Sequence, residues 1–269
     1  MGETQGTINI LIRGIKHLGN SEFAVDFFST LEECGDKYIP FKIGISEPIR
    51  TQYSIENAKK LWDDSKKSMN GYGGLLFKAK SNKDFHGSIE WLKTGENKIS
   101  IYISPIVLTS NENVQQLIDL SKKFFSWSNG VYGYGAHFSQ LNIHYIPGIN
   151  YKTCLGGITW LSLFGEPYVE MFGRDALRTA PCSVEEFAEN CFLLLTSDMP
   201  MIPTDEILKR QQMVREHLGS DAFFRQEEKE NFFREYTDKE ILEGKDVLSS
   251  EGYRHPDFAK YLQQTKSIK

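Results

Sequence analysis

The spacing of apolar residues along the chain predicts β-strands first. Apolar and polar residues alternate with a period of two in several segments, and short apolar runs mark others. In the segment 38–46, the alternating apolar side chains from Ile39 to Ile45 would lie on one face of a strand. The predicted strands are residues 7–15, 38–46, 75–79, 86–92, 98–103, 131–141 and 191–196, with an apolar strand or buried turn at 158–164.

A spacing of three and four residues between apolar positions predicts helices. The clearest is 111–127, which is followed by Asn129 and Gly130, a pair suited to a left-handed C-terminal cap. The run from Ser183 to Glu186 has the pattern of a helix capping box, but a strand pattern follows it, so we expect a short turn there. The remaining predicted helices are 54–69, 167–173 and 204–218.

The order of these elements predicts an α+β fold. Strands come first, then one strong helix, more strands and further helices, rather than regularly alternating strand–helix units. We therefore expect an antiparallel β-sheet packed by helices on one side. No repeat or low-complexity linker divides the chain, so residues 1–225 are predicted to form a single domain. Residues 226–269 are rich in charge, and we expect an extension of short helices or partial disorder.

Composition and charge narrow the class of protein. The chain has 269 residues, of which 40% are hydrophobic and 13% aromatic, which is typical of a globular protein rather than a disordered one. No run approaches the ~20 apolar residues that a membrane-spanning helix needs. The net charge of −5 argues against a general nucleic-acid binder, which needs a basic surface, and is compatible with a basic protein partner.

The cysteines and the N-terminus predict the compartment. No two of the four cysteines form a CxxC pair, so reduced thiols in a reducing compartment are expected. Residues 1–7 lack the basic and apolar regions of a secretory signal. The expected location is the cytoplasm.

Catalytic and metal-binding motifs are absent from the sequence. The glycine-containing run 133–138 lacks the third glycine of a dinucleotide loop and the Lys-Ser/Thr pair of a phosphate loop, so no cofactor is expected. The histidines do not have the spacing of metal ligands, although His86 and His137 could approach one another in the sheet. The strongest enzymatic hypothesis pairs Cys154 with His137 or His144 as nucleophile and base. A Cys/His-dependent hydrolase or transferase therefore stays open as an alternative, as does a structural or adaptor subunit.

One segment has a distinctive sequence. Residues 157–174, GITWLSLFGEPYVEMFGR, resemble a signature of immunity protein family 52 and its relatives in bacterial polymorphic-toxin systems. The HGSIEW run at 86–91 and the HLG run at 217–219 fit the same resemblance, which covers about residues 70–225. Its signature positions, which we expect to support the fold rather than a partner contact, are Trp160, Phe164, Gly165, Pro167, Tyr168 and Gly173.

The resemblance implies a non-enzymatic, cytoplasmic immunity protein that binds a cognate bacterial toxin and blocks its active site. Toxins near this family are often nucleases, whose clefts must be basic to hold phosphate. Acidic surface residues would speed association with such a cleft. The predicted toxin-binding residues are Glu227, Glu228 and Glu230. The implied partner is a protein, not nucleic acid or a membrane.

Overall fold

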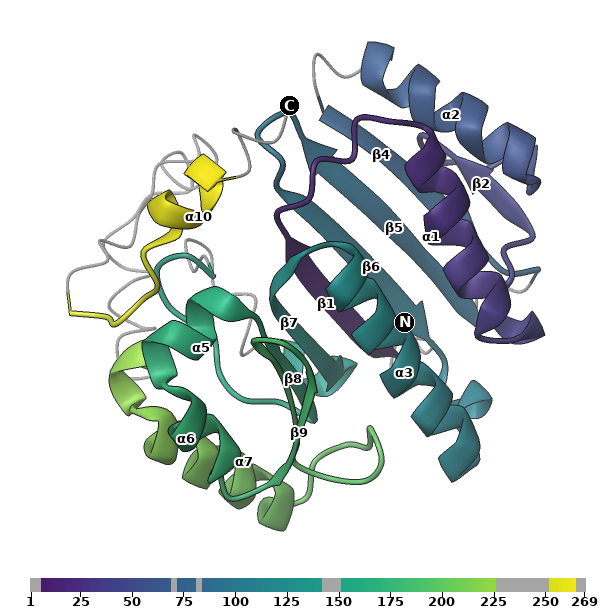
Figure 1. The fold of residues 1–269 in the computed structure, drawn as a ribbon. Helices are drawn as coiled ribbons and strands as arrows, with labels where there is room; N and C mark the ends of the chain where they lie inside the picture. The colour runs from purple at the N-terminus through teal and green to yellow at the C-terminus, as the bar shows by residue number, and fades with distance from the viewer. Residues whose placement is uncertain (1–5, 69–71, 81–83, 142–150, 226–251, 265–269) are drawn as a thin grey trace, which may run out of the picture.

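The structure is a computed structural model that describes residues 6–68, 72–80, 84–141, 151–225 and 252–264. Within these residues, ten strands form one sheet in the order β3-β2-β4-β5-β6-β1-β7-β8-β10-β9, and each neighbouring pair is antiparallel (Figure 1). The strands are β1 Ile8–Gly14, β2 Lys42–Gly44, β3 Thr51–Gln52, β4 Tyr72–Lys78, β5 Phe85–Leu92, β6 Asn97–Ile103, β7 Gly130–His137, β8 Leu161–Phe164, β9 Ser183–Ala188 and β10 Cys191–Leu195.

Helices and single helical turns connect these strands. The helices are α1 Glu22–Glu33, α2 Ile55–Ser68, α3 Asn111–Trp127, α5 Glu166–Phe172, α6 Arg174–Arg178, α7 Asp205–Leu218 and α10 Phe258–Gln264. The turns of tighter, 3₁₀ type are η1 Asp36–Tyr38, η2 Pro105–Val107, η3 Phe138–Gln140 and η4 Ser220–Ala222.

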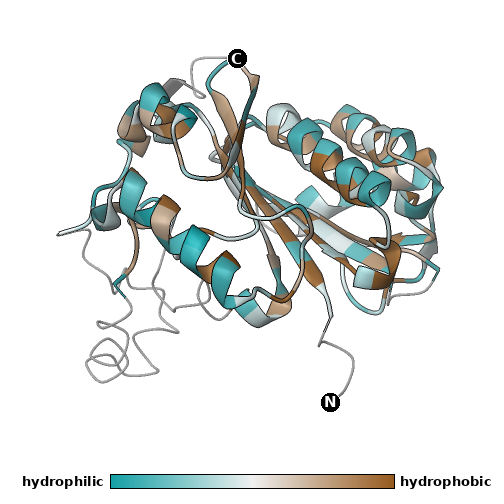
Figure 2. Ribbon diagram, turned by 90° about the horizontal axis from the view of Figure 1, so that it is seen from below, coloured by the Kyte–Doolittle hydropathy of each residue, from teal (hydrophilic) through white to brown (hydrophobic). Residues whose placement is uncertain are grey.

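Helices α1, α2 and α3 cover one face of the sheet and form the first core. Phe27 of α1 stacks on Phe124 of α3, with ring centroids 4.6 Å apart. Trp62 of α2 stacks on Trp91 of β5 at 4.1 Å. A Cβ at Gly73 of β4 would overlap the Trp91 indole, so the sheet has room for this tryptophan only because its cross-strand neighbour is glycine. Hydrophobic and hydrophilic residues alternate along the ribbons of these helices (Figure 2), and the first core contains hydrophobic residues from all three.

Helices α5, α6 and α7 lie against the opposite face, over β7, β8, β10 and β9, and form the second core (Figure 1). Its centre is a group of rings: Phe164 of β8 lies 5.6 Å from Tyr168 and 5.4 Å from Phe172 of α5, measured between centroids. Phe223 stacks on Phe172 at 6.2 Å and closes the core from the segment after α7. Aromatic burial of this kind supplies much of a core's stabilising apolar area.

Residues 252–264 return to this second core. Phe258 of α10 is 6% exposed, and its ring centroid lies 5.4 Å from that of Tyr151. Lys260 Nζ lies 2.9 Å from both carboxylate oxygens of Glu170 in α5. This part of the C-terminal segment therefore packs on the same core as the chain before residue 225.

The predicted α+β class with an antiparallel sheet is confirmed. The expectation that helices pack on one side is wrong, because they lie on both faces. The reason is that the strands in the second half of the sheet are apolar on both faces. In β10, Leu193 belongs to the first core and Leu194 to the second, and each needs a covering layer.

Two local predictions were also wrong. In the segment 38–46 only β2 is a strand: turn η1 ends at Tyr38, and Ile39 and Phe41, which follow it, are 36% and 37% exposed rather than on a buried face. The capping-box run at Ser183 begins strand β9, because its backbone pairs with β10. No prediction covered helix α1, which buries four side chains in the first core.

Candidate functional site

The aromatic signature positions lie in the two cores. Trp160 is 2% exposed, and its Nε1 donates a hydrogen bond to the carbonyl of Ser197 at 2.9 Å. Phe164 ends β8 and is fully buried, and Tyr168 of α5 is 1% exposed. These side chains contribute packing, and their burial leaves little surface for a partner to contact.

The other signature positions shape the backbone between β8 and α6. Gly165 is the N-cap of α5, and a Cβ there would overlap the carbonyl oxygen of Gly130 in β7. Pro167 lies in the first turn of α5, where a missing N–H costs nothing. Gly173 separates α5 from α6 with a φ of 88°, a left-handed conformation that side chains disfavour.

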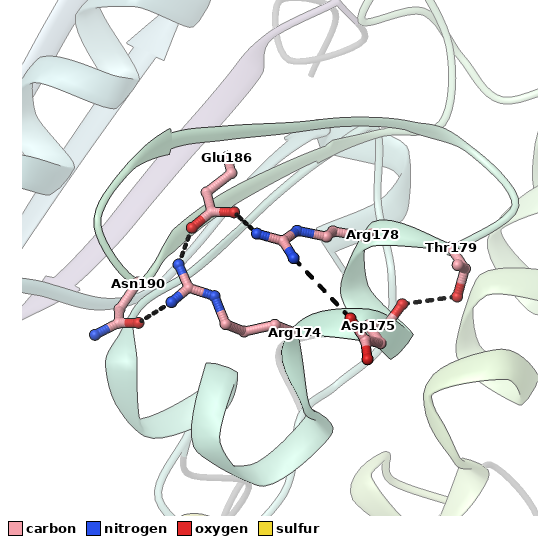
Figure 3. Close-up of polar contacts among 6 residues, drawn as sticks. All are labelled: Arg174, Asp175, Arg178, Thr179, Glu186 and Asn190. Carbon is pink, nitrogen blue, oxygen red and sulfur yellow. Dashed lines mark hydrogen bonds and ion pairs between the residues drawn. The ribbon is translucent and has the colours of Figure 1, made fainter.

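A polar cluster joins α6 to the β9–β10 hairpin (Figure 3). Arg174 and Arg178 both donate hydrogen bonds to the carboxylate of Glu186, Arg178 at 2.7 Å. Arg174 also donates to Oδ1 of Asn190 at 3.1 Å. The pKa of Glu186 is lowered from its ordinary value of 4.5, mainly by the hydrogen bond from Arg178, and the hydrogen bond from Arg174 lowers it further. This cluster immediately follows the signature and holds the hairpin in place.

The neighbouring carboxylate of β9 holds the same hairpin from the other face. Glu185 lies 3.1 Å from Nζ of Lys122 in α3, whereas Glu186 bonds to α6. Because β9 is an edge strand, a charged residue on each face also opposes pairing with a foreign strand. Both glutamates therefore have a structural role.

The proposed catalytic pair does not form an open site in the described residues. Cys154 is 2% exposed, in the segment that leads to the second core, and His144 lies outside the described residues. His137 is 4% exposed, with Nδ1 2.8 Å from Oγ of Ser139. His86 stacks on Tyr102 and is separated from β7 by strands β6 and β1, so the sheet does not bring His86 and His137 together.

The remaining cysteines are held as thiols. Burial raises the pKa of Cys182 and of Cys191 to about 11, and it also raises the pKa of Cys34. In the part of the chain that the structure describes, no group of three or more His, Cys, Asp or Glu side chains is placed to hold a metal ion. In the same part, no helix has the length and apolar character to cross a membrane.

The predicted toxin-binding residues Glu227, Glu228 and Glu230 lie outside the described residues, so they stay a prediction.

The candidate site that the structure reveals is an apolar surface at one end of the sheet. The registers place the start of β1, β2 and β8 and the end of β6, β7 and β10 at this same end. Among the described residues, six of the nine exposed large hydrophobic side chains follow or precede these strand ends. We call this surface the apolar end; its residues are Ile39, Phe41, Ile106, Phe138, Met201 and Ile202.

The most exposed side chains of the apolar end lie in turns and loops beside the strand ends. Ile106 of η2 is 73% exposed, and Met201 and Ile202, between β10 and α7, are each 61% exposed. Strands β6, β7 and β10 lie two positions apart in the sheet, so their ends are separated by roughly 10 Å steps. A hollow of about 510 Å³ between η1 and η2 is lined by Ile39 and Phe41 together with the charged residues Asp36, Lys37, Lys80 and Asp84. Large apolar side chains as exposed as Ile106, Met201 and Ile202 are candidates for contact with a protein partner.

Sequence reasoning missed the apolar end because its members are far apart in the chain. The loop from Asp198 to Pro203 contains the one local signal: Met199, Pro200, Met201 and Ile202 give an apolar run between a strand and a helix, where polar residues are usual. The other members become neighbours only through the strand order.

The fold is similar to that of a solved structure. It matches the Pseudomonas aeruginosa T6SS protein PA0821 with a TM-score of 0.57, over 79% of this chain and 73% of that one, at 12% sequence identity. At this identity the likeness shows the fold alone. No family model matches the chain, so the likeness of residues 157–174 to immunity protein family 52 stays a resemblance. No curated protein matches the chain either.

Proposed function

We propose that this chain is an immunity protein that neutralises a cognate secreted bacterial toxin, by binding the toxin and blocking its active site. The single observation that carries the proposal is the apolar end, whose exposed side chains have the character of a protein interface. Exposed isoleucine, phenylalanine and methionine side chains reduce solubility unless a partner covers them.

Two further observations support a toxin as that partner. The fold is similar to that of PA0821, a protein of the type VI secretion system (T6SS) of Pseudomonas aeruginosa. The signature segment resembles an immunity family. Its residues support the fold, so the exposed residues can differ among immunity proteins that bind different toxins. The proposed toxin class is a nuclease and the proposed place of action is the cytoplasm, where a nuclease meets its substrate.

The proposal describes inhibition by stoichiometric binding rather than by turnover. An inhibitor of this kind must associate fast and dissociate slowly, because a few free toxin molecules are harmful. Charged groups raise the association rate, whereas buried apolar contacts lower the dissociation rate. The net charge of −5 would raise the association rate, and the side chains of the apolar end would lower the dissociation rate.

Co-expression tests the proposal. The products of the genes adjacent to this one are each expressed in a heterologous bacterium with and without the chain, and growth is followed to identify a toxic effector domain. We expect protection, a purified complex, and toxin inhibition that saturates at a fixed molar ratio. The Cys154→Ser variant should protect as well as the wild type, because no step uses the thiol. Absence of a complex with that effector, or inhibition that continues far below equimolar chain, would contradict the proposal.

A further inference from the structure

We infer that the loop from Asp198 to Pro203 is the part of the apolar end that enters the partner, and that it fits an apolar hollow bordered by lysine or arginine side chains on a protein. This inference rests on the proposed function, and it names the contact segment and the chemistry of the surface that receives it.

The loop presents two large apolar side chains in a fixed place. Met201 and Ile202 are each 61% exposed, whereas Pro200 beside them is buried (the loop runs from β10 to α7 in Figure 1). Pro200 and Pro203 restrict the backbone on either side of this pair. A methionine next to a branched aliphatic residue can adapt to an irregular apolar hollow.

Hydrogen bonds hold the start of the loop. The carbonyl of Ser197 accepts from Nε1 of Trp160 at 2.9 Å, and Oγ of Ser197 donates to the carbonyl of Met199 at 2.9 Å. The N–H of Met201 donates to the same carbonyl at 2.9 Å. The signature tryptophan thus positions the exposed loop, although it lies in the core itself.

Helix α7 holds the end of the loop. The side chain of Thr204 caps the helix by accepting from the N–H of Ile207 at 3.4 Å. One turn later Arg210 reaches back and donates to the carbonyl of Thr196, the residue after β10, at 3.0 Å. Because both ends are held, binding has little loop entropy to remove, which favours affinity.

The charge around the loop indicates what borders the receiving hollow. Three exposed carboxylates, Asp198, Asp205 and Glu206, flank the two apolar side chains. Two cations follow in α7: Lys209 is exposed, and Arg210 is bonded to the Thr196 carbonyl and lies 3.4 Å from Glu206. The balance is acidic, and a basic border on the partner complements it. An apolar projection with an acidic border fits the basic cleft of the proposed toxin class.

The first test measures binding of the chain to the effector domain that it protects against. The double variant M201S/I202S removes both apolar side chains from exposed positions and should leave thermal unfolding unchanged. We expect the dissociation constant to rise at least 30-fold, which is the loss for one strong contact residue at about 2 kcal/mol. The matched control is Met213→Ser on α7, which is 47% exposed and outside the apolar end, and should bind as the wild type does.

The second test separates the charge from the apolar contact. The variant D198K/D205K should slow association several-fold at low salt, and the difference should shrink as salt is raised, while dissociation changes little. Unchanged binding by M201S/I202S, with the wild-type complex intact, overturns the inference and leaves the proposed function standing.

A wild-type chain that binds no effector overturns the proposed function. A third measurement then tests whether the loop contacts any protein partner. A photo-crosslinking residue is placed at position 202 in the native cell. A crosslinked protein that binds the purified wild type, but binds M201S/I202S at least 30-fold more weakly, supports the loop as a contact segment. No crosslink at this position overturns it.

Discussion

Gly165 lies against the backbone of Gly130, so closely that a Cβ on Gly165 would overlap the carbonyl oxygen of Gly130. The contact joins the N-terminus of α5 to the start of β7, and the N–H of Gly165 donates to the carbonyl of Val131 at 3.1 Å in the same place. It gives a physical reason for one of the signature positions: the second core closes only if helix and strand approach without a side chain between them.

This contact predicts a large effect of a small substitution. Gly165→Ala should lower the free energy of unfolding by about 3 kcal/mol, at the upper end for overpacking, because the obstructing atom is backbone and cannot rotate away. Gly173→Ala should cost about 1–2 kcal/mol, from its left-handed φ rather than from a clash. Urea unfolding measures both. Gly19→Ala, where the space is open, is the control and should be neutral; equal losses at all three positions would contradict the argument.

Shortening a buried side chain of α3 in the first core should lower the free energy of unfolding. Leu117 is fully buried, and Leu117→Ala should destabilise the protein by about 2–5 kcal/mol, because the lost methyl groups leave space that neighbours fill only in part. Leu208→Ala, at a 41% exposed position of α7, is the matched control and should change stability by less than about 1 kcal/mol. Thermal and urea unfolding of the two variants give the comparison.

The Glu186 cluster predicts a pH dependence. Its pKa in the folded chain is lower than the ordinary 4.5, so the unfolded chain binds more protons at acidic pH. The stabilisation is therefore complete above about pH 4.5 and is lost as the pH falls through the lowered pKa. Glu186→Gln should be less stable than the wild type at pH 7, and the difference should vanish at acidic pH.

The C-terminal helix predicts that residues after 251 contribute to the folded unit. Phe258→Ala should cost about 3 kcal/mol, because this ring is 6% exposed against the second core. Phe138→Ala, at a 43% exposed position, is the control and should be near neutral. If both variants unfold at the wild-type urea concentration, α10 is not part of the cooperative core.

The acidic run before α10 gives a prediction about association. Charge reversal of Glu227, Glu228 and Glu230 together should lower the rate of association with the cognate toxin at low salt. The difference from the wild-type rate should shrink as salt is raised, because salt screens exposed charges, with a Debye length of ~8 Å at physiological ionic strength. Stopped-flow kinetics on the folded variant measure it. A larger effect from D198K/D205K would place the electrostatic contact at the apolar end instead.

The sequence by itself determined the elements whose pattern is local. The alternation in β1, β5 and β6 and the helical stripe of α3 depend on neighbours within a few residues, and a buried face demands such a pattern wherever the element lies. The signature positions were expected to support the fold, and their burial and backbone geometry give each of them a physical role there.

Only the tertiary structure decided the features that depend on strand order. Ser183 begins a strand because β10 offers it backbone partners, which outweighs its capping-box pattern. The helices divide between two faces because Leu193 and Leu194 both need cover, a demand that no single segment reveals. The apolar end exists because antiparallel pairing brings Ile106, Phe138 and Met201 to one end of a ten-stranded sheet within the described residues. The residues of this surface are far apart in the sequence, and they form a candidate binding site only because the pairing of distant strands brings them to the same end of the sheet.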